Sequence, residues 1–577
     1  MPRPLLFLVY SGSVAVSRIT AGLAALGAAS PLAVALQGEP AAQVAPPATE
    51  LRLVVMLAVD QMIPEQLERL APQLEGGLGR LYRQGTVYRD AMLPYARTET
   101  GAGHVTFSTG CLPRSHGVVG NGFWDRGLGR EVYCVEDLEV CQVLGSGPVE
   151  GSGQRSPKNL DRPTIGEIMQ AKNPASRVVS ISAKDRAAIG MAGRSQGLVL
   201  WWDKNGGGFQ TSTFYSPSIP DYVSHWNDGW LERNRGFVWE PVGNRTERDF
   251  RLIGSDVDDR EGERPFSGLG VTFPYSIAKD ASEKAMGNFA FETPLCDRFV
   301  AELAREAIRQ ESLGADDDVD LLCVSFSSCD VIGHANGPFS REVTDVLFRL
   351  DRELGLLFDE LDKRVGADRW ALALTADHGI LPLPEYLRPR GVDAFRVPRG
   401  ESSAFRGEFV ERLQERLGSR VRHRSAPGGF RLDEEEMKAA GLDPATTRQV
   451  AAEVCREVAQ RYPWVQTVYS YEEIQAFDES ADGLEKLLRN SFQPDRTADL
   501  VVVNRPYVLE GIEKGTNHGS PHEYDRRIPL VFYGAAFPKR ISSRPAGSQD
   551  VVPTLLGLLG VPAPGTGLDG VDLGSDL

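Results

Sequence analysis

Six aspartate and histidine residues have side chains that suit divalent metal ions. They are Asp60, Asp330, His334, Asp377, His378 and His518. Carboxylates and imidazoles without cysteine favour Zn²⁺ or another borderline divalent ion over an iron–sulfur cluster. Three Asp and three His can hold two ions with three protein ligands each, which leaves open positions for a substrate. Two such ions about 3.5–4 Å apart would bind both the attacking and the leaving oxygen of a phosphoryl displacement.

The stretch RTETGAGHVTFSTG, residues 97–110, offers a nucleophile for such a reaction. It places Thr98 and Thr100 directly before Gly-Ala-Gly and a short helical pattern. The stretch alone leaves two interpretations open, because a threonine before a helix is also a common N-cap. A threonine hydroxyl is a weak nucleophile at neutral pH, and coordination to a metal ion is one way to activate it.

Four apolar, β-rich runs each end in a polar residue. LRLVVMLAVD ends at Asp60, SRVVSISAK at Lys184, VDLLCVSFSSCD at Asp330, and RWALALTADH at Asp377 and His378. A single aspartate at a strand end is more often a cap or turn residue than a ligand, but several together favour a site. Near-continuous apolar runs are typical of parallel strands covered on both faces, and helical patterns lie between them. We therefore expect an α/β fold with a largely parallel central sheet covered by helices, and with these residues at one edge of that sheet.

The composition indicates a large globular protein that does not bind polyanions. The chain has 577 residues and a formal net charge of −16, which argues against a broad surface for nucleic-acid polymers or anionic membranes. We expect residues 51–577 to form a monomeric catalytic domain with two insertions over its active-site edge. The first, at about residues 191–295, is rich in Trp, Gly and Asn, and its tryptophans suit either a substrate mouth or a core. The second, at about residues 383–495, contains two amphipathic helices and suits a small α+β subdomain.

The N-terminal residues indicate export. In residues 1–36 two apolar runs flank Arg18, and Ala33-Val34-Ala35 fits a small-x-small cleavage site. This pattern leaves a cleaved signal peptide and a retained anchor open, and residues 37–50 are typical of a linker. No later stretch approaches the ~20 apolar residues of a membrane helix. We therefore expect a periplasmic or secreted protein with no membrane contact beyond such an anchor.

Seven cysteines occur without a C-x-x-C pattern. The short spacing of Cys134 and Cys141 suits a disulfide-closed loop in an oxidising compartment, and the sequence leaves the disulfide and the free thiols equally open. Cys323 lies in an apolar run and is expected in the core.

The order and wording of these segments resemble the alkaline phosphatase superfamily. TGAGHVTFSTGCLPRSHGVVGN is similar to the nucleophile segment of the nucleotide pyrophosphatases/phosphodiesterases, and AVDQM, SSCDVIGHANGP, TADHG and NHGSPHEYDRRIPLVFYG continue the match. AKDR points more narrowly to the phosphate-irrepressible alkaline phosphatases, which carry Lys-x-Arg at this place. The resemblance runs from about residue 52 to the C-terminal DVVPTLLGLLGVPAP.

The resemblance implies two Zn²⁺ ions as cofactors. It implies that the metal that binds the nucleophile Thr100 is also held by Asp60, Asp377 and His378. It implies that the other metal is held by Asp330, His334 and His518. His522 lies four residues after His518 and is a rival ligand, but the family pattern favours His518. The implied reaction is in-line attack by Thr100, a phosphothreonine intermediate, and its hydrolysis by a metal-bound hydroxide.

The resemblance further implies that Asn121, Lys184 and Arg186 contact the phosphoryl oxygens. Two cations suit the dianionic terminal group of a phosphate monoester better than a diester, which has one fewer charge and a second bulky group. The alternative is that these cations pair with Asp185 or other acids. We therefore expect an alkaline phosphatase that acts on small-molecule phosphate monoesters. Two other functions stay open, namely a phosphodiesterase or nucleotide pyrophosphatase on the same scaffold, and an inactive exported protein that binds phosphate and metal.

Overall fold

The computed structural model describes residues 51–574, apart from residues 146, 206, 256, 267–268, 427 and 535. The signal peptide or anchor and the linker expected for residues 1–50 lie outside the described residues. By its contacts, the described chain forms one unit.

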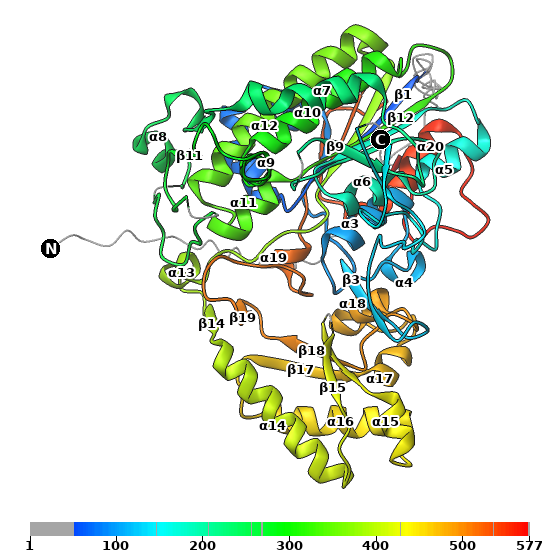
Figure 1. The fold of residues 1–577 in the computed structure, drawn as a ribbon, viewed down its shortest axis with the longest axis vertical. Helices are drawn as coiled ribbons and strands as arrows, with labels where there is room; N and C mark the ends of the chain where they lie inside the picture. Colours follow the sequence, from blue (N-terminus) through cyan, green and yellow to red (C-terminus); the bar gives the residue numbers. More distant parts are fainter. Residues whose placement is uncertain are drawn as a thin grey trace, which may run out of the picture. The chain divides into compact units, whose positions relative to one another are not determined.

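An eleven-stranded sheet forms the centre of this unit, in the order β21-β2-β20-β13-β1-β12-β7-β8-β9-β5-β6 (Figure 1). Its parallel core consists of β13 (Trp370–Thr375), β1 (Leu53–Val59), β12 (Asp320–Phe326), β7 (Val178–Ser182) and β8 (Gly197–Trp202). On one side the sheet continues through β20 (Leu530–Gly534), β2 (Thr86–Tyr88) and β21 (Arg540–Ser542). On the other side it continues through β9 (Phe209–Ser212), β5 (Gln142–Leu144) and β6 (Gly147–Val149). The predicted α/β fold with a largely parallel sheet is confirmed.

Every residue of β1, β7, β12 and β13 is buried, so both faces of the sheet need cover. Two groups of helices provide it. One group contains α2 (Gly77–Gln84), α10 (Leu295–Gln310), α11 (Ser328–Asn336) and α12 (Arg341–Leu361). The other contains α3 (Thr100–Thr109), α5 (Ile165–Lys172), α6 (Asp185–Ala192) and α20 (Val551–Leu559). Figure 1 shows α10 beside α12, and α3 beside α6.

The region expected as the first insertion contributes to the central sheet as well as to its cover. β8 and β9 lie in the sheet, and α7 (Asp221–Asn234), β10 (Val238–Trp239), α8 (Glu247–Leu252), β11 (Tyr275–Ser276) and α9 (Glu283–Phe291) follow them. Trp202, Trp230 and Trp239 are buried in the main apolar core. The core interpretation therefore holds for these tryptophans, because buried indoles cannot line an open substrate mouth.

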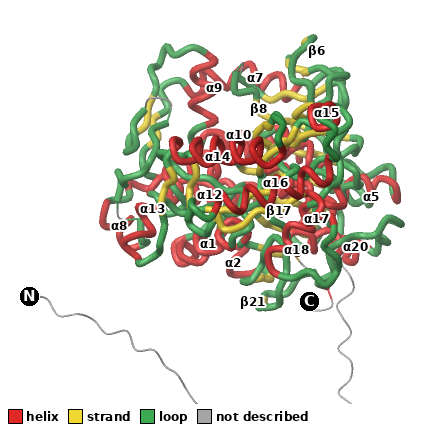
Figure 2. Tube along the Cα trace, turned by 90° about the horizontal axis from the view of Figure 1, so that it is seen from below, coloured by secondary structure: helices red, strands yellow, loops and turns green. Residues whose placement is uncertain are grey.

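The region expected as the second insertion has a sheet of its own (Figures 1 and 2). It also has an apolar core of its own. The sheet has the order β15-β16-β18-β17, with bounds β15 (His423–Ala426), β16 (Gly429–Leu432), β18 (Leu500–Asn504) and β17 (Val465–Ser470). It packs with α14 (Arg399–Leu417) and α16 (Pro444–Ala459) around Phe405, Phe409 and Trp464. We name this part the small subdomain. Its strand β18 lies beyond residue 495, where the sequence places the end of the insertion.

Short elements connect these parts. They are α1 (Pro64–Leu70), α4 (Pro113–His116), β3 (Gly122–Asp125), β4 (Arg130–Tyr133), α13 (Pro384–Leu387), β14 (Phe395–Val397), α15 (Glu434–Ala439), α17 (Tyr471–Gln475), α18 (Gly483–Ser491), β19 (Val508–Glu510) and α19 (Glu523–Arg526). Cys134 and Cys141 are free thiols, so the disulfide left open by the sequence is absent, and Cys323 is buried in the core. Within residues 51–574 as described, no helix has the length and apolarity needed to span a membrane.

Gly103 lets α3 pack against the residue that follows β13. A Cβ atom at Gly103 would lie 2.2 Å from the Asp377 carbonyl oxygen and 2.6 Å from the Asp377 Cβ, so only glycine permits this approach. The Gly-Ala-Gly after Thr100 thus brings the first turn of α3 next to Asp377.

We expect Gly103→Ala to destabilise the protein by about 1–3 kcal/mol, because the new methyl group must displace Asp377 or tilt α3. The variant should also bind less metal per chain. Thermal unfolding and metal analysis after dialysis measure both effects. The matched control is Gly407→Ala in α14, where a Cβ atom would meet nothing within 4 Å. This control should be neutral or more stable by up to about 1 kcal/mol. Equal behaviour of the two variants would contradict the packing argument.

Candidate active site

The strand ends of the parallel core bring three acidic side chains together. Asp60 directly follows β1, Asp330 lies in the first turn of α11 after β12, and Asp377 lies two residues beyond β13. Their exposed fractions are 0%, 4% and 1%. Since parallel strands direct their carboxyl ends to one edge of a sheet, residues from distant parts of the sequence meet here.

The histidines complete two close groups of ligand atoms. Within each group the atoms lie within 4.8 Å of one another, and the groups are Asp60 with Asp377 and His378, and Asp330 with His378 and His518. The first is one of the two predicted ligand sets. The second contains His378 where the prediction has His334.

His334 contacts the second group but is not part of it. Its Nε2 atom is 3.2 Å from Asp330 Oδ1, and its ring centre is 5.0 Å from that of His518. The rings of His378 and His518 stack with their centres 3.5 Å apart. All six predicted ligands therefore gather in one place, and their division between two ions stays a prediction.

The chemistry of these groups fits a divalent metal. Asp60 Oδ1, Asp377 Oδ2 and His378 Nε2 are buried and have no hydrogen-bond partner. Such atoms cost about 1–3 kcal/mol each unless something binds them. Burial lowers the pKa of His378, and burial with the neighbouring His378 and His334 lowers that of His518 well below the usual value. A lowered pKa favours the neutral imidazole, which is the form that binds a metal.

Lys184 joins the two groups electrostatically. Its Nζ atom donates a hydrogen bond of 2.6 Å to Asp60 Oδ2 and another to Asp330 Oδ2. Burial opposes the charge of Lys184, but Asp330 and Asp60 outweigh it and raise the lysine pKa. Burial, reinforced by repulsion from Asp330 and Asp377, raises the pKa of Asp60. Burial also opposes the charge of Asp330, but Lys184 and His334 outweigh it and lower the pKa of Asp330. Lys184 thus pairs with Asp60 and Asp330 and not with Asp185, so the alternative that this cation pairs with other acids holds for Lys184 in this structure.

Thr100 is the first residue of α3 and is 1% exposed. The N-cap of this helix is Glu99, and no side chain caps it by a hydrogen bond. The helix-cap interpretation of Thr100 is therefore wrong. Its hydroxyl instead accepts a hydrogen bond of 3.3 Å from Arg186 Nη2. The hydroxyl also stands at the positive end of the helix dipole, which favours negative charge.

Asn121 is oriented by the start of the same helix. Its Oδ1 atom accepts a hydrogen bond of 2.8 Å from the Gly101 N–H, and its backbone N–H donates one of 2.7 Å to Glu99 Oε2. With the carbonyl oxygen turned to the helix, the Nδ2 group remains as the donor that Asn121 can present to a ligand.

Tyr133 holds Arg186 and is a site residue that sequence reasoning missed. It lies at the end of β4, and its hydroxyl accepts 3.3 Å from Arg186 Nη1 and donates 2.6 Å to Asp185 Oδ1. Arg155 Nε donates a hydrogen bond of 2.8 Å to the other carboxylate oxygen of Asp185, Oδ2. Asp185 therefore orients Tyr133. Burial opposes the charge of Arg186, but Tyr133 and Asp185 outweigh it and raise the Arg186 pKa. Tyrosines in hairpins are common, so the sequence holds no signal for this role.

Gln61 is a second residue that was missed. Its φ of 71° turns the chain sharply after Asp60, and its N–H donates 3.1 Å to Asp377 Oδ1. The Gln61 Nε2 atom donates 2.6 Å to Asp330 Oδ1. Gln61 thus holds both carboxylates by neutral hydrogen bonds. The only possible signal was a left-handed backbone conformation directly after the strand-end aspartate. The sequence does not reveal it, because glutamine rarely adopts this conformation.

Two further histidines, His116 and His522, and Thr98 make hydrogen bonds near the site or outside it. His116 Nε2 lies 3.0 Å from the Thr106 hydroxyl, and both side chains are buried. His522 Nε2 lies 2.8 Å from the Asn504 carbonyl oxygen, and His522 is in neither ligand group. The Thr98 carbonyl oxygen lies 2.7 Å from His518 Nδ1 and orients that ring.

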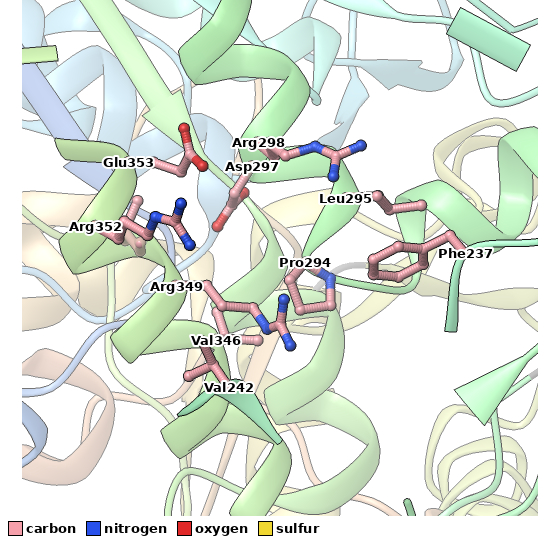
Figure 3. Close-up of a pocket in the computed structure, with 11 residues that line it drawn as sticks. Phe237, Val242, Pro294, Leu295, Asp297, Arg298, Val346, Arg349, Arg352 and Glu353 are labelled. Atoms are coloured by element: carbon pink, nitrogen blue, oxygen red, sulfur yellow. The ribbon is translucent and has the colours of Figure 1, made fainter. Parts of the chain in front are cut away.

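A cavity of about 200 Å³ between α10 and α12 is distinct from this site (Figure 3). Its lining includes Phe237, Asp297 and Arg349, and none of the predicted site residues. Asp297 nevertheless connects it to the site. Its Oδ1 atom accepts 2.8 Å from the N–H of Ser327 and 3.0 Å from that of Ser328, at the start of the helix that carries Asp330.

Comparisons with known proteins agree with this geometry. The family model described as type I phosphodiesterase / nucleotide pyrophosphatase matches residues 54–525. The alkaline phosphatase PafA of Elizabethkingia meningoseptica is 31% identical over 531 residues, which cover 89% of this chain and 92% of that protein. The alkaline phosphatase PhoV of Synechococcus elongatus is 30% identical over 524 residues, which cover 89% of this chain and 90% of that protein.

A crystal structure of wild-type PafA superimposes with a TM-score of 0.82 at 29% identity, and it covers 92% of this chain and 99% of that chain. The similarity therefore extends over most of the chain and is not confined to one motif. The chain belongs to the type I phosphodiesterase / nucleotide pyrophosphatase family of the alkaline phosphatase superfamily, as a homologue of the PafA-like phosphate-irrepressible alkaline phosphatases across nearly its whole length.

Proposed function

We propose that this protein is an alkaline phosphatase that hydrolyses small-molecule phosphate monoesters with two Zn²⁺ ions and a phosphothreonine intermediate. The observation that carries the proposal is the position of Thr100, whose hydroxyl accepts from the Arg186 guanidinium at the start of α3, the helix that packs against Asp377 at Gly103. The names of PafA and PhoV support the phosphatase activity. We further propose a monomer in the periplasm or outside the cell, on the strength of the export pattern in residues 1–36.

The chain's own residues account for the binding of the phosphoryl group. The planar guanidinium of Arg186 is oriented by its hydrogen bond to Tyr133, so two of its N–H groups can donate hydrogen bonds to two phosphoryl oxygens. Asn121 donates a neutral hydrogen bond from Nδ2, and the first turn of α3 adds its positive dipole. These donors are already oriented, and Arg186 and Asn121 are partly buried, so they stabilise the charge of the transition state with little reorganisation.

Two displacements at phosphorus complete the reaction. The Thr100 oxygen attacks phosphorus while the bond to the substrate's alcohol oxygen breaks, and the alcohol leaves with a proton. Water then attacks the phosphothreonine, the bond to the Thr100 oxygen breaks, and phosphate is released. Bound by Asp60, Asp377, His378, Asp330, His334 and His518, two divalent ions would supply the positive charge that lowers the pKa of the nucleophiles and stabilises the leaving oxygen.

A second candidate is a phosphodiesterase or nucleotide pyrophosphatase, which the matching family model favours. Lys184 is the residue on which the choice depends. Lys184, which pairs here with Asp60 and Asp330, would favour the additional charge of a monoester if it contacts the phosphoryl group, whereas a diester places an ester group there. The inactive binding protein is disfavoured, because the proposed nucleophile and all six proposed ligands are present in the chain.

We expect Thr100→Ala to lower turnover of p-nitrophenyl phosphate by at least about 10³-fold, because the variant lacks the proposed nucleophile. The zinc content measured by mass spectrometry should stay near that of the wild type, since the other ligands remain. Thr98→Val removes the neighbouring hydroxyl and should lose far less activity. If Thr100→Ala keeps its activity, or if Thr98→Val is the inactive variant, the assignment of the nucleophile is wrong.

Lys184→Ala and Arg186→Ala should each lower kcat/KM for p-nitrophenyl phosphate by about 10²-fold or more. The loss for bis-p-nitrophenyl phosphate should be much smaller, because the diester carries one charge fewer. Lys158→Ala, at a half-exposed surface lysine, is the control and should be neutral. A wild type that prefers the diester, or equal losses on both substrates, would favour the phosphodiesterase instead.

Tyr133→Phe should lower kcat/KM for p-nitrophenyl phosphate about tenfold, since Arg186 keeps its charge but loses one hydrogen bond that orients it. The matched control is Tyr215→Phe, because the Tyr215 hydroxyl donates 2.8 Å to the Gly193 carbonyl oxygen instead. Steady-state kinetics on both substrates would test the role. A Tyr133→Phe enzyme as active as the Tyr215→Phe enzyme would rule out positioning by Tyr133.

A further inference from the structure

Asp525 is a buried aspartate that has no part in the proposed reaction. It lies in the short helix α19 (Figure 1) and is 1% exposed. A buried carboxylate is costly unless hydrogen bonds satisfy it. Its Oδ2 atom accepts a hydrogen bond of 2.9 Å from the Ser520 N–H and one of 2.6 Å from the Ser520 hydroxyl. Because Ser520 is two residues after His518, the carboxylate holds the loop that carries this predicted ligand.

The backbone of Asp525 holds the segment of a second predicted ligand. Its carbonyl oxygen accepts a hydrogen bond of 2.8 Å from the N–H of Gly379, which directly follows His378. A Cβ atom at Gly379 would lie 2.3 Å from the Tyr524 carbonyl oxygen, so a side chain there would displace this segment from α19. Asp525 therefore connects the segment of His378 with the loop of His518.

Thr98 completes the network on the side of the proposed nucleophile. Its hydroxyl donates a hydrogen bond of 3.1 Å to the Ser520 carbonyl oxygen. Its own carbonyl oxygen lies 2.7 Å from His518 Nδ1, and the other ring nitrogen, Nε2, lies 3.8 Å from Asp330 Oδ1. The ring of His518 is thus held at Nδ1 by Thr98, and its loop is held at Ser520 by Asp525.

We propose that Asp525 is a positioning residue that orients His518, and with it the segment of His378, for metal binding. The inference rests on the proposed role of both histidines as metal ligands. Asp525 belongs to neither close group of ligand atoms and acts through Ser520 and Gly379. Residues that orient a ligand in this way change metal affinity or activity by about 10- to 100-fold when they are replaced.

The effect of a substitution should concern His518 more than His378. The two hydrogen bonds from Ser520 end on the side chain of Asp525, so a shorter side chain removes them. The hydrogen bond from Gly379 ends on the backbone carbonyl oxygen, which every variant keeps.

Asp525→Ala tests the proposal in the full chain loaded with zinc. We expect the affinity for one zinc ion, measured by competition with a chelator, to fall by about 10- to 100-fold. Hydrolysis of p-nitrophenyl phosphate should fall with it, and added zinc should restore much of the activity. Amide hydrogen exchange should become faster in residues 517–522, because the Ser520 N–H loses its acceptor.

Two further variants identify the cause of the loss. Asp525→Asn keeps an amide oxygen that can accept both hydrogen bonds from Ser520, so it should recover most of the zinc affinity and the slow exchange. Ser520→Ala removes the hydroxyl and keeps the N–H, so it should show a smaller loss in the same direction. This variant makes the test if Asp525→Ala does not fold.

Asp320→Ala is the matched control. Asp320 is 0% exposed and accepts hydrogen bonds from the Arg177 and Gly314 N–H groups, 2.7 and 2.8 Å long. It is the first residue of β12, at the opposite end of that strand from the site. The control should lower the unfolding midpoint but leave the zinc affinity and the exchange of residues 517–522 as in the wild type.

Three results would overturn the proposal. The first is an Asp525→Ala protein that binds zinc and exchanges like the wild type. The second is an Asp525→Asn protein as deficient as Asp525→Ala, and the third is an equal zinc loss in Asp320→Ala, which would mean general destabilisation. A wild type that neither binds zinc nor hydrolyses the ester would overturn the proposed function instead. Exchange in residues 517–522 would then still decide whether Asp525 holds the loop.

Discussion

Repulsion among three buried carboxylates is the constraint on which this structure depends. Asp60, Asp330 and Asp377 meet at the end of three adjacent parallel strands, with water excluded. Lys184 offsets part of the repulsion by bonding to two of them, and His334 offsets a further part at Asp330, since its Nε2 atom lies 3.2 Å from Asp330 Oδ1. The unpartnered oxygens and nitrogen that remain are the atoms that a metal would satisfy. A site of this kind stays assembled only if the backbone around it is rigid.

The surrounding chain supplies that rigidity through contacts that look unremarkable in sequence. Gly103 lets a helix approach Asp377 more closely than any side chain would allow, and Gln61 adopts a rare backbone conformation to donate to Asp377. Asp297 fixes the start of the helix that carries Asp330. Each contact orients a predicted ligand through its neighbours, so the precision of the site comes from packing as much as from the predicted ligands.

Much of the site could be predicted, because apolar strands and the residue types that suit a metal ion are both visible as local patterns in the sequence. The four apolar runs that end at Asp60, Lys184, Asp330 and Asp377 are strand or near-strand ends in the structure, and the fold class follows from their parallel arrangement. Tyr133 and Gln61 were not predictable, since their types are common and their roles depend on a partner from another element. The composition of residues 191–295 likewise suggested an insertion, but β8 and β9 pair with the central sheet. The sequence could not show this, because the partners of a strand cannot be predicted from that strand alone.

The sequence by itself determined the types of the reacting groups, their attachment to strand ends, and the family to which the chain belongs. Only the tertiary structure decided that the Thr100 hydroxyl faces Arg186 and caps no helix, that Lys184 pairs with Asp60 and Asp330 but not with Asp185, and that His378 takes part in both ligand groups. The physical reason is that residue type and spacing encode local conformation. Hydrogen bonds and charge pairs between distant segments depend instead on where the packed core places them.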